Sequence, residues 1–182
     1  MNYNTIYSMD KVFKEFNKVT LKLYNLWSNH MIYTWRWWLQ VLIAILPWIL
    51  WVIIRKKESA GRLLYAGFFT MLIATYTDVL GTTLGLWEYP VKLLPIFPPM
   101  APWDSTVMPV TTMIFLQYKT EINPFLKAFI YSFFGAYVLE PLAVILKLYK
   151  PFGWKHIYSF IVFFVIYIFT NYIFMRDNFK KI

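Results

Sequence analysis

Cysteine is absent from this sequence, and charged residues make up only 15% of it. Without cysteine there can be no disulfide, no thiolate metal site and no cysteine nucleophile. A soluble domain typically carries about 25% charged and about 45–50% apolar residues, whereas 59% of these 182 residues are hydrophobic and 22% are aromatic. Despite its net charge of +9, the chain is too apolar for a soluble, disordered or nucleic-acid-binding protein. The composition therefore predicts an integral membrane protein with lysine and arginine at the membrane ends.

Several catalytic motifs are also missing. The sequence has no glycine-rich phosphate loop, no HExxH and no GxSxG, which sets aside the chemistry that these motifs support. Two well-separated histidines and no cysteine disfavour a transition-metal site. We expect neither metal nor cofactor, although a divalent ion held by Asp78, Asp104 and Glu140 stays open. No lysine lies between His156 and Met175, so the last apolar segment has no residue for a retinal Schiff base.

Residues 1–30 have the pattern of an amphipathic helix that lies in the lipid headgroup region. No signal peptide is evident in them. The polar stripe contains Lys11, Lys14, Lys18 and Lys22. Apolar residues recur at spacings of three and four on the other face: Met9, Val12, Phe13, Phe16, Val19, Leu23, Tyr24 and Trp27. This segment is either an anchor that covers the bundle or a membrane-surface sensor or partner contact.

Residues 31–182 are predicted to form a single all-α domain, a polytopic membrane helix bundle with five spans. We expect the spans at about 37–54, 63–87, 105–118, 124–146 and 156–175. Asp104 stands where the N-cap of the third span belongs. A proline-rich stretch too dense for a regular helix separates the second and third spans; its prolines are Pro90, Pro95, Pro98, Pro99 and Pro102.

Basic residues close to the spans, including Lys180 and Lys181 at the C-terminus, predict the orientation in the cell membrane. They slightly favour the N-terminus and the proline-rich loop outside, with the C-terminus in the cytoplasm.

Three of the nine acidic residues, Asp78, Asp104 and Glu140, fall within or at the start of spans. A charge near the bilayer centre costs about 2.5–3.5 kcal/mol on insertion scales, so each needs a partner, a proton or a function. With a rise of about 1.5 Å per residue and alternating span directions, all three converge on one half of the bundle. The convergence predicts a shared acidic site.

These carboxyl groups have two interpretations. A carboxyl group shielded from water can hold a proton and donate it as a general acid. Each can equally be structural, paired with Arg36, Lys92 or Lys155 or capping a helix. The tryptophans fit the aromatic belt at the membrane interfaces or a ligand pocket. We assign candidate catalytic roles to the three acids and candidate ligand-binding roles to Trp87, Tyr89, Trp103, Gln117, Trp154, His156 and Tyr158.

Several motifs together resemble an uncharacterised family of small five-span membrane proteins from endospore-forming Firmicutes. The resemblance covers roughly Trp37 to the C-terminus and implies the architecture and candidate residues, because the family has no assigned reaction. The matching elements are Asp78-x2-Gly81-x3-Gly85-Leu-Trp87-Glu-Tyr89-Pro90, Pro102-Trp-Asp104-Ser-Thr-Val-Met-Pro109, Gln117-Tyr118, Glu140-Pro141 and Trp154-Lys-His156-Ile-Tyr158-Ser159.

A fainter similarity links the chain to the small integral-membrane lycopene cyclases. Those enzymes carry an Asp, a Gly-x-Trp-x-aromatic element and a Leu-Pro-x-Glu-Glu element in the same order. Here the corresponding elements are Asp78, Gly85-Leu-Trp87-Glu-Tyr89 and Ala101-Pro102-Trp-Asp104, with Ser105 in place of the second acid. The resemblance implies protonation of an alkene, with Asp78 or Glu140 completing the acid pair.

Three functions are therefore expected from the sequence. The first is an acidic intramembrane pocket that binds an isoprenoid or other lipid and catalyses an acid-dependent isomerisation or cyclisation. The second is a small transporter component or proton pathway, and the third a structural or interaction protein linked to sporulation. The expected partners are membrane lipids and an isoprenoid-like ligand, with a second copy or a protein partner left open and nucleic acid excluded.

Overall fold

The computed structural model describes residues 3–95 and 100–176, and these residues are mostly helical. Four helical runs are long and apolar enough to cross a membrane: α2 (Trp35–Ile54), the run Lys57–Thr83 that contains α3 (Ala60–Thr83), the run Pro124–Ile145, and α7 (His156–Phe174). Their outward-facing aliphatic and aromatic side chains are exposed, as lipid-facing residues would be. The chain is therefore an all-α membrane protein. The predicted features at Pro98, Pro99, Lys180 and Lys181 lie outside the described residues.

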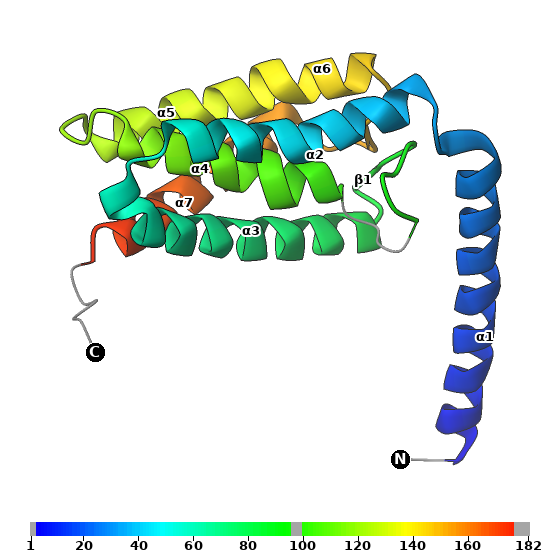
Figure 1. Cartoon of the computed structure of the whole chain (residues 1–182). Helices are drawn as coiled ribbons and strands as arrows, with labels where there is room; N and C mark the ends of the chain where they lie inside the picture. The colour runs from blue at the N-terminus through cyan, green and yellow to red at the C-terminus, as the bar shows by residue number, and fades with distance from the viewer. Residues whose placement is uncertain (1–2, 96–99, 177–182) are drawn as a thin grey trace.

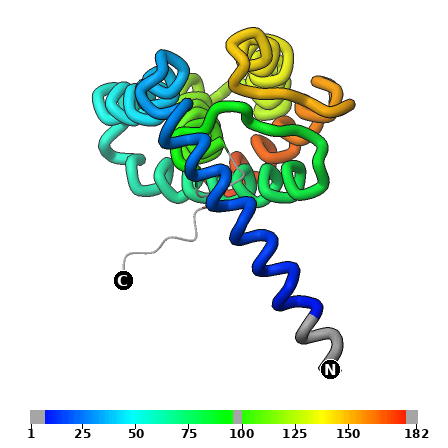
Figure 2. Tube along the Cα trace, turned by 90° about the vertical axis from the view of Figure 1, so that its right-hand side faces the viewer, coloured from blue at the N-terminus to red at the C-terminus, as the bar shows by residue number. Residues whose placement is uncertain are grey.

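A shorter helix, α4 (Met108–Gln117), lies inside the bundle (Figures 1 and 2). It contacts α2, α3, α5 and α7, and most of its side chains are buried. It has ten residues, which is fewer than a membrane crossing needs, although a π-helical turn over Trp103–Val107 precedes it. The predicted third span, 105–118, is thus a buried helix that begins with a π-helical turn. The five-span count is not established by helix length.

Asp104 does not cap this helix, so that expectation was wrong. It lies within the π-helical turn that precedes α4, and the N-cap position of α4 itself belongs to Val107. Helical backbone already begins at residue 101, because Pro102 is compatible with a first helical turn. The Asp104 side chain is consequently free to point into the bundle.

The second span ends earlier than predicted, because α3 stops at Thr83 rather than continuing to Trp87. Gly85 has a φ of +68°, a left-handed conformation that glycine adopts without strain. The amide of Leu86 then donates to the carbonyl of Gly81 at 2.9 Å, which closes the helix in a Schellman-like turn. This turn sends the following residues back across the end of the bundle.

Two short strands hold that returning segment in place. β1 (Trp87–Glu88) pairs antiparallel with β2 (Lys150–Pro151), and the amide of Phe152 donates to the carbonyl of Leu86 at 2.8 Å. Lys150 forms an exposed ion pair with Glu88 at 3.0 Å. The ribbon therefore joins the loop after α3 to the loop before α7, although some 60 residues separate them in sequence.

The run Pro124–Ile145 is one helix with a π-helical turn in it. α5 (Pro124–Phe134) leads into a π-helical turn (Gly135–Leu139) and then into α6 (Glu140–Ile145). Both π-helical turns of the bundle lie just N-terminal to a proline, which cannot donate a backbone hydrogen bond. At the other turn, Trp48 donates through Nε1 to the carbonyl of Ser105 at 3.3 Å, an oxygen that Pro109 cannot bond.

The N-terminal helix α1 (Tyr3–Leu26) leaves the bundle end and runs across the direction of the other helices (Figures 1 and 2). A π-helical turn (Trp27–Met31) joins it to α2, and Trp27 donates to the carbonyl of Lys92 at 3.0 Å. Apolar residues of α1 such as Phe13 and Phe16 are exposed. This direction suits a helix that lies along a membrane surface.

Candidate functional site

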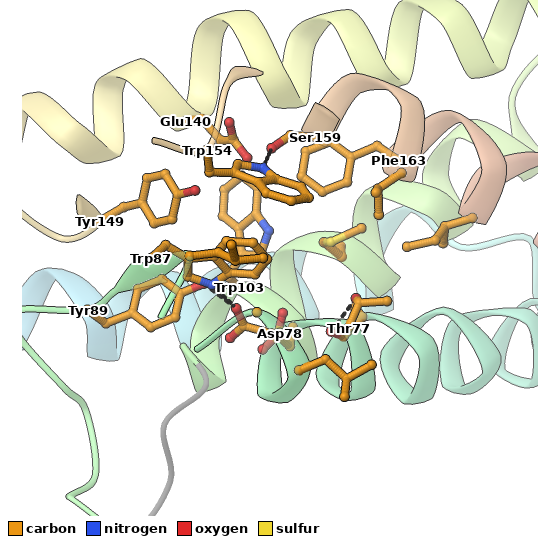
Figure 3. A pocket seen from close by; sticks show the side chains of 18 of the residues that line it. Thr77, Asp78, Trp87, Tyr89, Trp103, Glu140, Tyr149, Trp154, Ser159 and Phe163 are labelled. Carbon is orange, nitrogen blue, oxygen red and sulfur yellow. Dashed lines mark hydrogen bonds between the residues drawn. The ribbon is translucent and has the colours of Figure 1, made fainter. Parts of the chain in front are cut away.

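A cavity of about 240 Å³ lies at the end of the bundle where α3 ends and α7 begins. α3, the π-helical turn before α4, α6, α7 and the β ribbon all contribute to its walls. All three candidate acids line it, as do Trp87, Tyr89, Trp103 and Trp154. Figure 3 shows Asp78 and Glu140 on opposite walls, with the tryptophan rings between them.

Asp78 is 5% exposed and accepts three hydrogen bonds. Its Oδ1 receives Nε1 of Trp87 at 2.6 Å and the hydroxyl of Tyr89 at 2.5 Å. Its Oδ2 receives the amide of Met100 at 3.0 Å. The turn at Gly85 and the β ribbon bring Trp87 and Tyr89 back to the carboxyl group. Three donors around one buried carboxylate provide the compensation that a buried charge requires.

Asp104 is 3% exposed, and its carboxyl group lies beside that of Asp78 in the cavity wall. Two neighbouring carboxyl groups do not readily ionise together, because like charges repel. Asp78 already accepts three hydrogen bonds, so Asp104 is the candidate holder of a proton. Within the described part of the chain, Oδ2 of Asp104 has no hydrogen-bond partner. The two acids are therefore a candidate buried proton donor.

Glu140 occupies the opposite wall in a second hydrogen-bonded group. Its Oε2 lies 2.8 Å from Nδ1 of His156, and its carboxyl group is also hydrogen-bonded to Ser159. Trp154 donates through Nε1 to Oγ of Ser159 at 2.8 Å. The His156 side chain is 36% exposed, against 11% for Glu140. This group therefore connects the cavity wall with the exposed N-terminal end of α7.

Aromatic rings make up much of the remaining wall. The rings of Trp87 and Trp154 meet edge to face, with centroids 4.9 Å apart. Trp103, Met108 and Phe163 line both this cavity and a second one of about 90 Å³, which has mostly apolar walls. An apolar ligand would find matching surface in both cavities.

Two of the sequence-predicted site residues lie away from the cavity. Gln117 is at the opposite end of the bundle, where its side chain bonds the backbone of Ile54 and Lys56. Tyr158 is exposed and packs on Trp154, with ring centroids 5.3 Å apart. His156 reaches the cavity only through Glu140. Arg36, expected as a partner for an acid, donates instead to the carbonyl of Leu146 at 2.9 Å.

Several lining residues were not among the predicted site residues. Tyr149 and Ser159 lie next to Glu140, and Gly81 lies under the ring of Trp87. Helical spacing from Asp78 could have indicated Gly81. Tyr149 is brought to the site by the β ribbon, which only the folded chain reveals.

The phenol of Tyr89 is held in its neutral form. Burial, and next the charges of Asp78 and Asp104, raise its pKa well above the usual 10.0. Because the folded pKa exceeds the unfolded one, the stabilisation is complete below pH 10 and is lost as the pH rises through the folded pKa. We predict that the free energy of unfolding of Tyr89→Phe falls less steeply above pH 10 than that of the wild type. The difference should approach about 1.4 kcal/mol per pH unit, and equal slopes in chemical unfolding would contradict it.

No group of three or more metal-ligating side chains in the described residues is arranged to hold a metal ion. Asp78, Asp104 and Glu140 therefore do not form a shared divalent site here. Comparison with protein-family models, curated proteins and solved structures finds no match for this chain.

Proposed function

We propose that this membrane protein binds an apolar ligand of the isoprenoid type in the bundle-end cavity and catalyses its acid-dependent isomerisation or cyclisation. One observation carries the proposal: the buried carboxyl groups of Asp78 and Asp104 open side by side onto an aromatic-walled cavity. The faint similarity to the small membrane lycopene cyclases, which protonate an alkene, agrees with it.

The proposed reaction needs no cofactor and changes no oxidation state. Asp104 transfers its proton to one carbon of an alkene, whose π electrons form the new C–H bond and leave a carbocation on the neighbouring carbon. Loss of a proton from an adjacent carbon, directly or after ring closure, restores a double bond. The proton returns to Asp104 or passes to Glu140, from which His156 can deliver it to water.

The aromatic rings have a defined role in this reaction. A carbocation over the face of an indole ring is attracted by the ring quadrupole, as other cations are, by about 0.5–2 kcal/mol for each ring. Trp87, Trp103 and Trp154 line the cavity between Asp78 and Glu140. An apolar wall also keeps out water, which would otherwise capture the cation.

The test is to incubate the purified full chain with neutral prenyl hydrocarbons in deuterated water and to analyse the products by mass spectrometry. Protonation by Asp104 deposits a solvent-exchanged deuteron on carbon, so an isomerised product that carries deuterium is expected. Recovery of every substrate unchanged and undeuterated would reject the enzymatic function.

We also propose five membrane crossings, with α4 and its π-helical turn as the third, and with the N-terminus outside. The supporting argument is that α4 runs antiparallel to α3 and α5 through the full bundle (Figure 1). The absence of cysteine allows clean single-cysteine labelling. In intact cells, an impermeant maleimide should label Glu88→Cys, which lies before α4, but not Lys119→Cys, which lies after it. Labelling of both positions or of neither would mean that α4 does not cross, and labelling of Lys119→Cys alone would place the N-terminus in the cytoplasm.

A further inference from the structure

The charged side chains among the described residues that line the bundle-end cavity are all acidic. The described residues that line it include the carboxyl groups of Asp78, Asp104 and Glu140 and no lysine, arginine or histidine. The Asp78 carboxylate, which accepts three hydrogen bonds, supplies a negative charge to the cavity. A charge in apolar surroundings is screened far less than in water, so it strongly prefers a cationic ligand to a neutral or anionic one.

The walls suit an organic cation in particular. The rings of Trp87, Tyr89, Trp103, Tyr149 and Trp154 surround the cavity. Aromatic faces attract cations, and cages of such rings are the common way in which proteins recognise quaternary ammonium groups. The cavity volume of about 240 Å³ accommodates one small ligand of this kind.

The hydrogen bonds in the cavity wall further limit which class of cation can bind. Asp78 is already supplied with three donors, whereas Oδ2 of Asp104 has no hydrogen-bond partner in the described chain. A metal ion needs several oxygen ligands, and the described residues provide no such arrangement. A quaternary ammonium group has no N–H to satisfy, and its methyl groups pack on ring faces.

We propose that the bundle-end cavity is a binding site for a quaternary ammonium group. The charge on the Asp78–Asp104 pair holds the cation, and the faces of the tryptophan rings enclose its methyl shell. Binding at this site does not depend on proton transfer, so it can be tested independently of the acid-catalysed reaction.

The test compares choline with the neutral alcohol in which a quaternary carbon replaces its nitrogen. Both probes have the same shape and dissolve in water, so they differ in charge alone. Isothermal titration of the detergent-solubilised full chain should show choline binding at least about tenfold more tightly. Equal affinities for the two probes would overturn the proposal.

Two variants locate the binding. Asp78→Asn removes the negative charge and should weaken choline binding about tenfold or more, whereas the exposed Glu88→Gln should leave it unchanged. Trp154→Leu keeps the carboxyl pair, and so remains informative if Asp78→Asn does not fold. It should weaken binding of choline and leave that of the neutral alcohol within about twofold. Wild-type choline affinity in both Asp78→Asn and Trp154→Leu would exclude this cavity.

The source of the ammonium group is distinguished by repeating the titration in lipid nanodiscs. Competition by phosphatidylcholine but not by phosphatidylglycerol identifies a lipid headgroup, and choline binding indifferent to both identifies a free cation. Choline binding without deuterium incorporation would uphold the cation site and reject the acid catalysis. Deuterium incorporation without a preference for choline would support the acid catalysis and reject the cation site.

Discussion

Replacing Asp104 with Asn is expected to lower deuterium incorporation into a prenyl substrate by at least about a hundredfold, the lower range for loss of a general acid. The amide has no acidic proton to transfer to carbon. Asparagine keeps the size of the side chain, and its amide can donate a hydrogen bond to the neighbouring Asp78 carboxylate. The measurement is the initial rate of deuterated product under saturating substrate.

The matched control is Glu88→Gln, which removes an exposed acid at the same end of the bundle. It should retain the wild-type rate, because Glu88 does not line the bundle-end cavity. Thermal unfolding of Asp104→Asn should remain close to that of the wild type. An Asp104→Asn protein with wild-type turnover would mean that Asp104 is not the general acid, and would leave Glu140 as the candidate.

The grouping of the three acids could be predicted from the sequence, because it depends only on helix rise and on alternating directions. The position of the Asp78 and Asp104 carboxyl groups side by side in one cavity wall could not. Whether two side chains at the same depth face each other depends on how each helix is rotated about its axis. That rotation is set by packing over the whole bundle, which includes the close contact of α3 with α4.

The same alternation argument explains why Gln117 lies far from the three acids. Asp104 lies at the start of its helical segment and Gln117 at the end, so the two side chains belong to opposite ends of the bundle. The resemblance included both residues among its motifs, whereas distance along the helix separates them. Tyr149 was not predicted, because the two-residue β ribbon that brings it to the site leaves no hydrophobic pattern in the sequence.

The error at the end of α3 has a local cause. Leu84, Leu86 and Trp87 continue the apolar composition of the helix, so hydrophobicity alone extends the span to Trp87. Gly85 was the stop signal, since helices commonly end with glycine in a left-handed conformation. Ending the helix there is what makes the site, because the reversed chain returns Trp87 and Tyr89 to Asp78.

Gly81→Ala is expected to destabilise the protein by about 2–4 kcal/mol, although alanine normally favours a helix over glycine by about 1 kcal/mol. A Cβ atom at position 81 would lie 1.9 Å from the ring of Trp87, so the ring must leave its position. The displaced indole no longer donates to Asp78, and loss of a hydrogen bond to a charged group costs about 1.5–3 kcal/mol. Chemical unfolding followed by tryptophan fluorescence measures the change.

Gly61→Ala provides the matched control in the same helix, because a Cβ atom at position 61 meets nothing within 4 Å. It should be neutral or stabilising by up to about 1 kcal/mol. The double variant Gly81→Ala, Trp87→Leu removes the clashing ring, and should be markedly more stable than the sum of its single changes predicts. Strict additivity, or equal effects of alanine at positions 61 and 81, would show that the Trp87 ring is not held over Gly81. The supply of donors to Asp78, on which both proposed activities depend, would then have to come from elsewhere.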